Sequence, residues 1–201
     1  MSSPQSLPVT FAMTGASGAP YAVRLLECLN NAGVPVNLVI SRTGWRLLDE
    51  ELDIRSEADL RSRTGDWSRV TVYADDDRGA TPASGSAPSR GMIVCPCSMG
   101  TLASIAQGTT RSLIERAADV VLKERRKLVL VPRETPYSMI HLENMLRLTQ
   151  AGAVVLPASP GFYHRPTRME DLIDFVVGRI LAHVDAPLVV GPVWASGGKR
   201  D

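Results

Sequence analysis

Small and polar residues follow the first apolar run of this 201-residue chain, at residues 14–20 (TGASGAP). Small side chains let a ligand approach the backbone, and the helical pattern that follows would offer its first amides to a phosphate. The spacing matches neither the dinucleotide fingerprint G-x-G-x-x-G nor the phosphate loop G-x-x-x-x-G-K-[ST]. The motif is therefore typical of two structures, a phosphate-binding turn and a tight strand-to-helix turn without a ligand.

Two hydroxyls and a cation follow the second apolar run, at residues 41–43 (SRT). They would lie beside the first turn if the two strands are neighbours in a sheet. Ser41 taken alone is typical of a helix N-cap. Glu51 comes ten residues later, and we expect it on the solvated face of a helix.

A C-x-C pair stands in residues 95–101 (CPCSMGT), at the end of another apolar run. A structural zinc site needs about four ligands, but the chain has no second cysteine pair and its three histidines are scattered singly, at positions 141, 164 and 183. The sequence therefore predicts no metal site. It predicts a hydroxyl-rich turn in which Ser98 and Thr101 donate to a phosphate or to the edge of a heterocycle.

Arg133 and Glu134 come directly after a fourth apolar run. Two interpretations are open: a structural ion pair, or a site for an anionic substrate with Glu134 as proton donor or acceptor. Arg116 and Lys123 in the preceding segment are seven residues apart, which puts them on one face of a helix. Such a basic face is ordinarily solvated.

A loop of aromatic and basic residues spans residues 160–166 (PGFYHRP), and a helical segment containing Arg179 follows it. The phenol of Tyr163 and the guanidinium of Arg179 suit a phosphate that carries an apolar tail. A subunit interface is the competing interpretation, because Tyr and Arg are favoured there. The acidic run at residues 75–77 lies in a loop-like stretch, and we expect it to be solvated rather than to bind magnesium.

The elements that position these residues alternate between short apolar runs and longer segments of helical period. Strands are predicted at residues 9–13, 36–40, 92–95, 128–131 and 153–156, with a weaker one at 70–73. Helices are predicted at residues 19–32, 44–52, 112–126, 140–150 and 170–184. Because the runs are apolar throughout, we expect a sheet covered on both faces.

This alternation predicts an α/β fold, with a three-layer, Rossmann-like, doubly wound sheet that is mainly parallel. We expect a single domain, with its core at about residues 8–185 and a tail at residues 186–201. Ligands of such sheets bind outside the carboxyl ends of the strands. The five polar stretches described above all follow predicted strands.

The charge balance excludes several kinds of partner. Lys and Arg total 22 and Asp and Glu total 21, giving a formal net charge of +1, so no global field favours nucleic acid or an anionic membrane. No apolar run approaches the roughly 18 residues of a membrane helix, and the first residues lack the pattern of a signal peptide. Three cysteines are too few for a disulfide framework. We therefore expect a cytoplasmic protein.

Several longer blocks together resemble the flavin prenyltransferase (UbiX-like) family from about residue 9 to residue 184. The blocks are TGASGAPYAVRLL, VISRTG, CPCSMGTLASIA, RAADVVLKERRKLVLVPRETPYSMIHLENM and LPASPGFYHRP. The resemblance implies transfer of a dimethylallyl group from dimethylallyl monophosphate to N5 and C6 of reduced FMN, without a metal. It also implies that the product, prenylated FMN, serves a partner decarboxylase, and that the chain forms a homo-oligomer, a dodecamer, with sites shared between subunits.

The resemblance also assigns residues. It implies FMN contacts at Gly15, Ala16, Ser17, Ser41, Ser98, Met99, Gly100, Thr101 and Arg133. It implies dimethylallyl phosphate contacts at Tyr163, Arg179, Arg116 and Lys123. It implies catalytic roles for Glu134 as the acid that assists phosphate departure, for Glu51 and Ser17 in proton handling at the flavin, and for Lys123.

The chain departs from the family pattern at one position. Some relatives carry a Trp shortly before the P-x-SGS segment, where its ring would face the allyl cation, and Arg78 stands there in this chain. We expect residues 83–86 (ASGS) to help exclude water from the cation, and Trp194 in the tail resembles a family tryptophan.

Two alternative functions remain. One is an FMN-dependent decarboxylase of the cysteine type, which usually carries P-A-[ST]-A-N-T and an early catalytic His, whereas the first histidine here is His141. The other is a non-catalytic subunit that delivers flavin. The combination of Glu134, Lys123, Tyr163 and Arg179 argues against it, because binding alone does not need an acid beside phosphate ligands.

Overall fold

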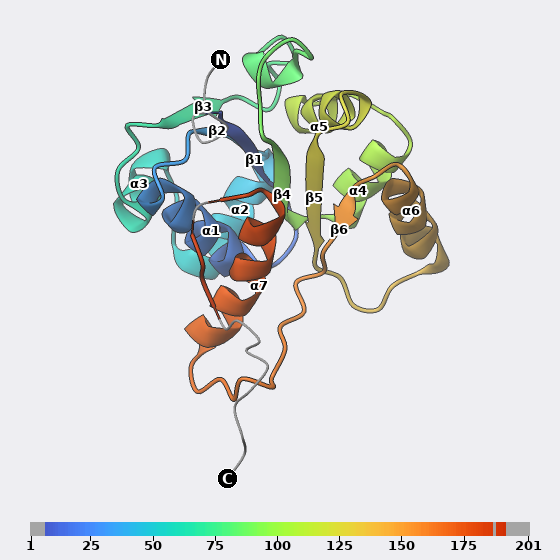
Figure 1. Ribbon diagram of the computed structural model, residues 1–201. Coiled ribbons are helices and arrows are strands. Elements are labelled where there is room, and N and C mark those ends of the chain that lie inside the picture. Colours follow the sequence, from blue (N-terminus) through green and yellow to red (C-terminus); the bar gives the residue numbers. More distant parts are fainter. Residues whose placement is uncertain (1–6, 187, 192–201) are drawn as a thin grey trace.

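The computed structural model describes residues 7–186 and 188–191 and shows a single six-stranded sheet (Figure 1). The strands are β1 (Val9–Met13), β2 (Val36–Ile40), β3 (Val70–Tyr73), β4 (Gly91–Cys97), β5 (Lys127–Pro132) and β6 (Val154–Val155). Their order is β3-β2-β1-β4-β5-β6, and each neighbouring pair is parallel. The predicted parallel sheet is confirmed, including its weaker strand β3.

Seven α-helices connect and cover the strands. They are α1 (Ala19–Asn31), α2 (Arg42–Leu52), α3 (Glu57–Thr64), α4 (Met99–Ala106), α5 (Leu113–Lys123), α6 (Met139–Gln150) and α7 (Met169–His183), with a short 3-10 helix, η2 (Thr81–Ala83). Among the described residues, no helix combines the length and the apolar character needed to cross a membrane.

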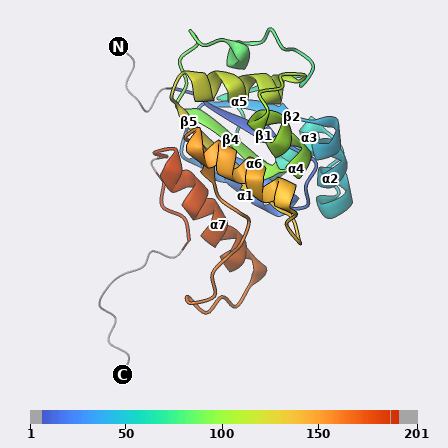
Figure 2. The same cartoon turned by 90° about the vertical axis from the view of Figure 1, so that its right-hand side faces the viewer.

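The sheet lies between two hydrophobic cores, because successive side chains of a strand point to opposite faces. Phe11 of β1 packs in the core formed with α1, α2, α3 and α7, and its neighbour Ala12 packs in the core formed with α4, α5 and α6. Both views show helices on the two sides of the sheet (Figures 1 and 2). The three-layer, doubly wound architecture is therefore confirmed.

Connections from β1 run outward to β2 and β3, whereas the chain then returns to place β4 on the other side of β1. The direction of winding thus reverses between β1 and β4. Such a switch point leaves a crevice outside the carboxyl ends of the two strands, where ligands of open α/β sheets bind.

Two helices were not predicted from the sequence. The expectation of a turn at residues 98–101 is wrong, because Ser98 caps α4 and Thr101 already lies in its first turn. The helix has apolar and small residues on all sides and therefore lacks the polar stripe that marks an amphipathic helix. Helix α3 is missed for the opposite reason, since Leu60 is its one buried large apolar residue.

The loop between β3 and β4 is tied to α5 at both ends of that helix. The Asp75 carbonyl accepts a hydrogen bond from the Leu113 amide (2.6 Å), and the Asp75 carboxylate accepts one from the Ile114 amide (3.1 Å). At the other end, the Arg126 guanidinium donates to the carbonyls of Gly85 (2.7 Å) and Ala87 (2.8 Å). Asp75 is thus a helix cap rather than part of a fully solvated acidic run.

Candidate functional site

Four neighbouring strands deliver the predicted flavin-binding segments to one edge of the sheet. Across the sheet, the segments after β2, β1, β4 and β5 begin at Ser41, Thr14, Ser98 and Arg133. Because these strands are parallel, their carboxyl ends lie at the same edge. The structure therefore brings together the segments holding the residues assigned to FMN, namely Gly15, Ala16, Ser17, Ser41, Ser98, Met99, Gly100, Thr101 and Arg133.

Thr14 joins the two strands at the switch point. Its hydroxyl donates to the Pro96 carbonyl (2.9 Å) and accepts from the Ser98 amide (2.8 Å), while its own amide donates to the same Pro96 carbonyl (3.2 Å). The residue is only 2% exposed. Sequence reasoning placed Thr14 in a small-residue turn and missed this role, although a hydroxyl directly after a buried strand was a usable signal.

Glu51 occupies the amino end of α1. Its carboxylate accepts hydrogen bonds from the amides of Gly18 (3.0 Å) and Ala19 (2.8 Å), where a helix favours a negative charge. Gly18 has a φ of 133°, which favours glycine. The expectation that Glu51 is solvated is wrong, and the α1 amides that the sequence offered to a phosphate are already bound to a carboxylate.

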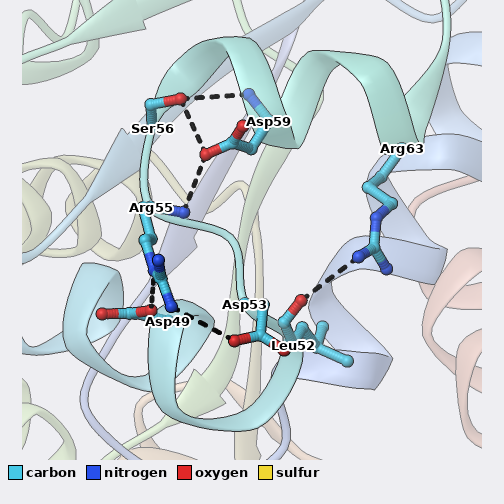
Figure 3. A network of polar contacts seen from close by, with 7 residues as sticks. All are labelled: Asp49, Leu52, Asp53, Arg55, Ser56, Asp59 and Arg63. Atoms are coloured by element: carbon cyan, nitrogen blue, oxygen red, sulfur yellow. Dashed lines mark hydrogen bonds and ion pairs between the residues drawn. The ribbon is translucent and has the colours of Figure 1, made fainter.

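The connection that follows Glu51 is held by a network of polar contacts (Figure 3). The Arg55 guanidinium donates to Asp49 (2.8 Å) and Asp53 (3.4 Å), and the Arg55 amide donates to Asp59 (3.0 Å). The Ser56 hydroxyl also donates to Asp59 and lowers the pKa of that carboxyl. These contacts join the end of α2 to the start of α3 and so help fix the turn of helix that carries Glu51.

Two pairs of hydroxyls stand at helix starts on this edge. Ser41 caps α2 by accepting from the Gly44 amide (3.0 Å), and its hydroxyl lies 3.1 Å from that of Thr43. Ser98 caps α4 by accepting from the Thr101 amide (3.2 Å), and its hydroxyl lies 3.0 Å from that of Thr101. Both pairs can donate to a ligand. The sequence predicted the hydroxyls, but not that Met99, Gly100 and Thr101 form a helical turn.

Arg133 and Glu134 complete this edge on the far side of β4. The Arg133 guanidinium donates to the Ser17 carbonyl (3.2 Å) and so links β5 to the first turn. The half-buried Glu134 carboxylate accepts from the Thr135 amide (3.0 Å). Among the described residues these two side chains do not pair with each other, so the structural ion pair is not observed. A cation and an acid are therefore both available to a ligand.

Tyr163 lies in the loop between β6 and α7, which projects beyond the rest of the molecule in both views (Figures 1 and 2). The rings of Tyr163 and Phe175 meet edge to face, with their centroids 5.8 Å apart. The His164 ring stacks on the Phe175 ring, with the centroids 5.6 Å apart. Tyr163 is 54% exposed. This loop therefore offers an aromatic surface to solvent or to a partner.

Arg179 lines a pocket of about 330 Å³ between α7 and residues 154–157, together with Phe175 and His183. These three residues recur every fourth position and so share one face of α7. Burial, with the nearby charges of Arg179 and Lys127, lowers the pKa of His183 and favours its neutral form. Apolar side chains beside a guanidinium suit the predicted phosphate with an apolar tail.

Lys123 is not brought to the flavin edge with Arg133. Lys123 ends α5 just before β5 begins, whereas Arg133 follows the end of that six-residue strand. The length of the strand separates their backbones by about 20 Å. Lys123 pairs with Glu124, and Arg116 pairs with Asp119 (2.9 Å). In one chain, Lys123 is therefore separate from the proposed acid.

Comparisons with known proteins agree with this geometry. The family model described as Flavoprotein matches residues 2–181. The flavin prenyltransferase UbiX of Pseudomonas aeruginosa is 49% identical over 202 residues, covering 96% of each chain. That of Halalkalibacterium halodurans is 52% identical over 177 residues, covering 86% of this chain and 85% of the relative. The chain belongs to the UbiX-like flavin prenyltransferase family.

Solved structures support the same assignment. A UbiX crystal structure in complex with FMN and dimethylallyl pyrophosphate has a TM-score of 0.87 and 42% identity, covering 96% of this chain and 99% of that chain. A dodecameric FMN-dependent UbiX-like decarboxylase from Escherichia coli O157:H7 also has a TM-score of 0.87, with 41% identity and coverage of 94% and 100%. The FMN-dependent cysteine decarboxylase TvaF has 18% identity and a TM-score of 0.57, covering 74% of this chain and 88% of that chain, and shows the fold alone.

The C-x-C pair of this flavin prenyltransferase family member lies in its core. Cys95 and Cys97 are fully buried, and burial raises the pKa of both thiols, that of Cys97 to about 12. Metal ligands are thiolates, so protonated thiols in an apolar core are poor ligands. Within the part of the chain that the structure describes, no group of three or more His, Cys, Asp or Glu residues is placed to hold a metal ion.

The sequence relates three positions to the allyl cation: Arg78, residues 83–86 and Trp194. Arg78, where we expected a tryptophan from the family resemblance, is exposed in the loop after β3. Gly85 lies against Lys123, since a Cβ atom added to it would be 2.7 Å from the lysine Nζ. The expected water-excluding loop, residues 83–86, therefore accompanies Lys123 rather than Arg133. Trp194 lies outside the described residues.

We predict that Thr14→Val lowers the free energy of unfolding by about 1–3 kcal/mol, because valine keeps the volume but leaves the Ser98 amide without an acceptor. Urea unfolding followed by circular dichroism measures the change. Thr71→Val, the same substitution at an exposed position of β3, is the control and should change the stability little. Equal midpoints for Thr14→Val and wild type would contradict the bridging role.

Proposed function

We propose that this chain transfers a dimethylallyl group from dimethylallyl monophosphate to N5 and C6 of reduced FMN, making prenylated FMN for a partner decarboxylase. One observation supports the proposal: in a UbiX-like chain, the segments assigned to FMN and the Glu134 carboxylate follow neighbouring parallel strands at one edge of the sheet. The donor hydroxyls and small residues of that edge suit a flavin nucleotide.

FMN would lie along the edge, across the ends of β2, β1, β4 and β5. Gly15, Ala16 and Ser17 would offer backbone approach, while Ser41 and the segment 98–101 would donate hydrogen bonds. Arg133 already contacts the carbonyl of Ser17, so it would meet FMN between the first turn and β5. Support for this placement comes from the common edge that these segments share.

The chemical problem is the departure of phosphate from an allylic carbon. The electron pair of the breaking C–O bond leaves with the phosphate, so the site must neutralise that anion and protect the allyl cation from water. Glu134 would give a proton to the departing phosphate. Tyr163, Arg179, Arg116 and Lys123 would bind it, and Lys123 would also stabilise the developing charge.

Proton handling at the flavin falls to Ser17 and Glu51 in this proposal. The Glu51 carboxylate binds the Gly18 and Ala19 amides, directly after Ser17 in the chain. Glu51 would act as a base or hold the turn in which Ser17 meets the flavin.

In a homo-oligomer with sites shared between subunits, Lys123 of one subunit would lie near Glu134 of another. A second copy would bring its α5 end and residues 83–86 to the flavin edge of the first. Large apolar side chains are exposed on α6, which immediately follows this edge: Met139, Ile140, Leu142 and Leu146. Exposed apolar patches of this kind are typical of interfaces. The dodecameric relative from Escherichia coli supports a dodecamer here.

We propose a cytoplasmic location as well. The three free cysteines, Cys28, Cys95 and Cys97, are all buried, as suits a reducing compartment in which disulfides are rare. Fractionation of cells that express the full chain, with a periplasmic and a membrane marker, tests this location.

We predict that the purified protein, given FMN, dithionite and dimethylallyl monophosphate without oxygen, forms a flavin enlarged by one C5 unit. Mass spectrometry of the released flavin detects the product. Omission of dithionite is the control, because the proposed acceptor is reduced FMN. A flavin of unchanged mass with wild-type protein would refute the prenyltransferase function.

We predict that Glu134→Gln binds FMN with wild-type affinity but forms the adduct at least 100-fold more slowly, within the typical range for loss of a general acid. Flavin fluorescence measures binding, and quenched-flow mass spectrometry measures the rate. Glu57→Gln, which alters an exposed carboxylate paired with Arg61 on α3, is the matched control. Equal rates for Glu134→Gln and wild type would remove Glu134 from the acid role.

We predict that two slow variants restore each other if sites are shared. Glu134→Gln and Lys123→Ala, co-expressed with different tags and purified as mixed oligomers, should prenylate FMN faster than either oligomer alone. The gain arises because some sites then combine an intact Glu134 with an intact Lys123. Activity no higher than that of the separate variants would show that both residues act within one chain.

A further inference from the structure

We infer that Phe175 is a positioning residue, whose ring holds the Tyr163 phenol on the face of α7 that carries Arg179, so that one phosphate meets both. The inference deepens the proposed function and rests on it, because Tyr163 and Arg179 are proposed ligands of the dimethylallyl phosphate. An apolar residue of a helix ordinarily packs in the core, but Phe175 is only half-buried.

Phe175 and Arg179 share one face of α7. They lie four residues apart in this helix, a separation of about 6 Å along the helix axis. Both side chains line the same pocket of about 330 Å³. A group held against the Phe175 ring is therefore held about one helical turn from Arg179.

Two consecutive rings of the loop between β6 and α7 pack on Phe175. The Tyr163 ring meets it edge to face, with the centroids 5.8 Å apart and the planes at 75°. The His164 ring stacks on it with the planes at 6°, and the rings of Tyr163 and His164 also meet edge to face, at 5.7 Å. These arrangements suit the charge distribution of aromatic rings. The cluster therefore fixes the direction of the Tyr163 ring as well as its place.

The backbone at Gly161 passes close to the same two rings. A Cβ atom added there would lie 3.1 Å from Cζ of Phe175 and 3.1 Å from Cε1 of Tyr163, closer than most such contacts. A side chain at this position would push against both rings, because closely packed groups leave little room to yield. The absence of a side chain at Gly161 thus lets the loop lie against Phe175.

His164 joins the cluster by ring packing. Both of its ring nitrogens are buried and have no hydrogen-bond partner among the described residues. The Arg165 amide donates to the Phe162 carbonyl (3.0 Å), which closes a turn within the loop and does not connect the loop to α7. Packing on Phe175 therefore links residues 161–164 to the helix.

This link matters because the two proposed phosphate ligands come from different elements. Tyr163 belongs to the loop, whereas Arg179 belongs to α7. Hydrogen bonds weaken steeply when their distance or angle is wrong, so ligands from two elements act together only when packing fixes those elements relative to each other. Removal of the Phe175 ring should therefore weaken phosphate binding through Tyr163.

The test is a double-mutant cycle on the affinity for dimethylallyl monophosphate. The full chain is loaded with oxidised FMN, so that the donor binds without reacting, and calorimetry measures the Kd. We expect Phe175→Leu, which removes the ring, and Tyr163→Phe, which removes only the hydroxyl, each to raise the Kd roughly 10-fold, as loss of a hydrogen bond to a charged group does. In the Tyr163→Phe background, Phe175→Leu should raise the Kd by at most about twofold, because the two substitutions remove the same interaction.

Ile180→Val is the control for general loosening of α7, because it removes a methyl group from the buried face of that helix. Its Kd for dimethylallyl monophosphate should stay within about twofold of wild type, and so should the Kd of Phe175→Leu for FMN, measured by flavin fluorescence, because neither change touches the groups that bind those ligands.

An unchanged Kd for dimethylallyl monophosphate in Phe175→Leu would overturn the inference. An equal rise in the wild-type and Tyr163→Phe backgrounds would also overturn it, because Phe175 would then act on the substrate or on the fold rather than through Tyr163. Wild-type protein that binds dimethylallyl monophosphate but forms no prenylated flavin with dithionite would refute the proposed function instead, while the cycle would still decide the role of Phe175. Wild-type protein that does not bind dimethylallyl monophosphate would overturn both.

Discussion

The hydrogen bonds of Thr14 hold together the crevice on which the proposed site depends. Connections that wind in opposite directions from two neighbouring parallel strands leave a gap at the carboxyl ends of those strands. Thr14 closes the base of this gap by bonding to Pro96 and Ser98 across it. One buried hydroxyl therefore sets how far the first turn lies from the start of α4. The proposed flavin contacts on both sides depend on that spacing.

The Glu51 carboxylate and the cations assigned to the site do not form ion pairs with one another among the described residues. Glu51 meets the positive end of α1 and is held by backbone amides rather than by Arg133. Arg133 remains linked to a neutral carbonyl of the first turn. Lys123 lies on α5, the length of β5 away from Arg133, and Arg179 lies on α7. A chain with a net charge of +1 thus carries these cations on separate elements.

Much of the fold followed from local patterns. Strands β1, β2 and β3 begin and end at the predicted residues. For β1 and β2 the reason is that short apolar runs between polar residues specify buried strands closely. Helices α3 and α4 were not predicted because neither shows an amphipathic stripe. Most residues of α3 are polar, and most residues of α4 are apolar or small. Glu51 was misjudged for a different reason. Its partners are amides 32 and 33 residues away in the chain, and sequence spacing carries no information about such a contact.

The sequence by itself determined the class of fold, the edge of the sheet at which chemistry would lie and, through resemblance, the family. These properties are local, since each depends on residue types within a short stretch. Only the tertiary structure decided which stretches meet. It joined β1 to β4 through Thr14, set Glu51 on α1, packed Tyr163 against Phe175, and left Lys123 the length of a strand away from Arg133. The reason is topological: strand order and winding direction arise from packing across the whole sheet, and no single segment encodes them.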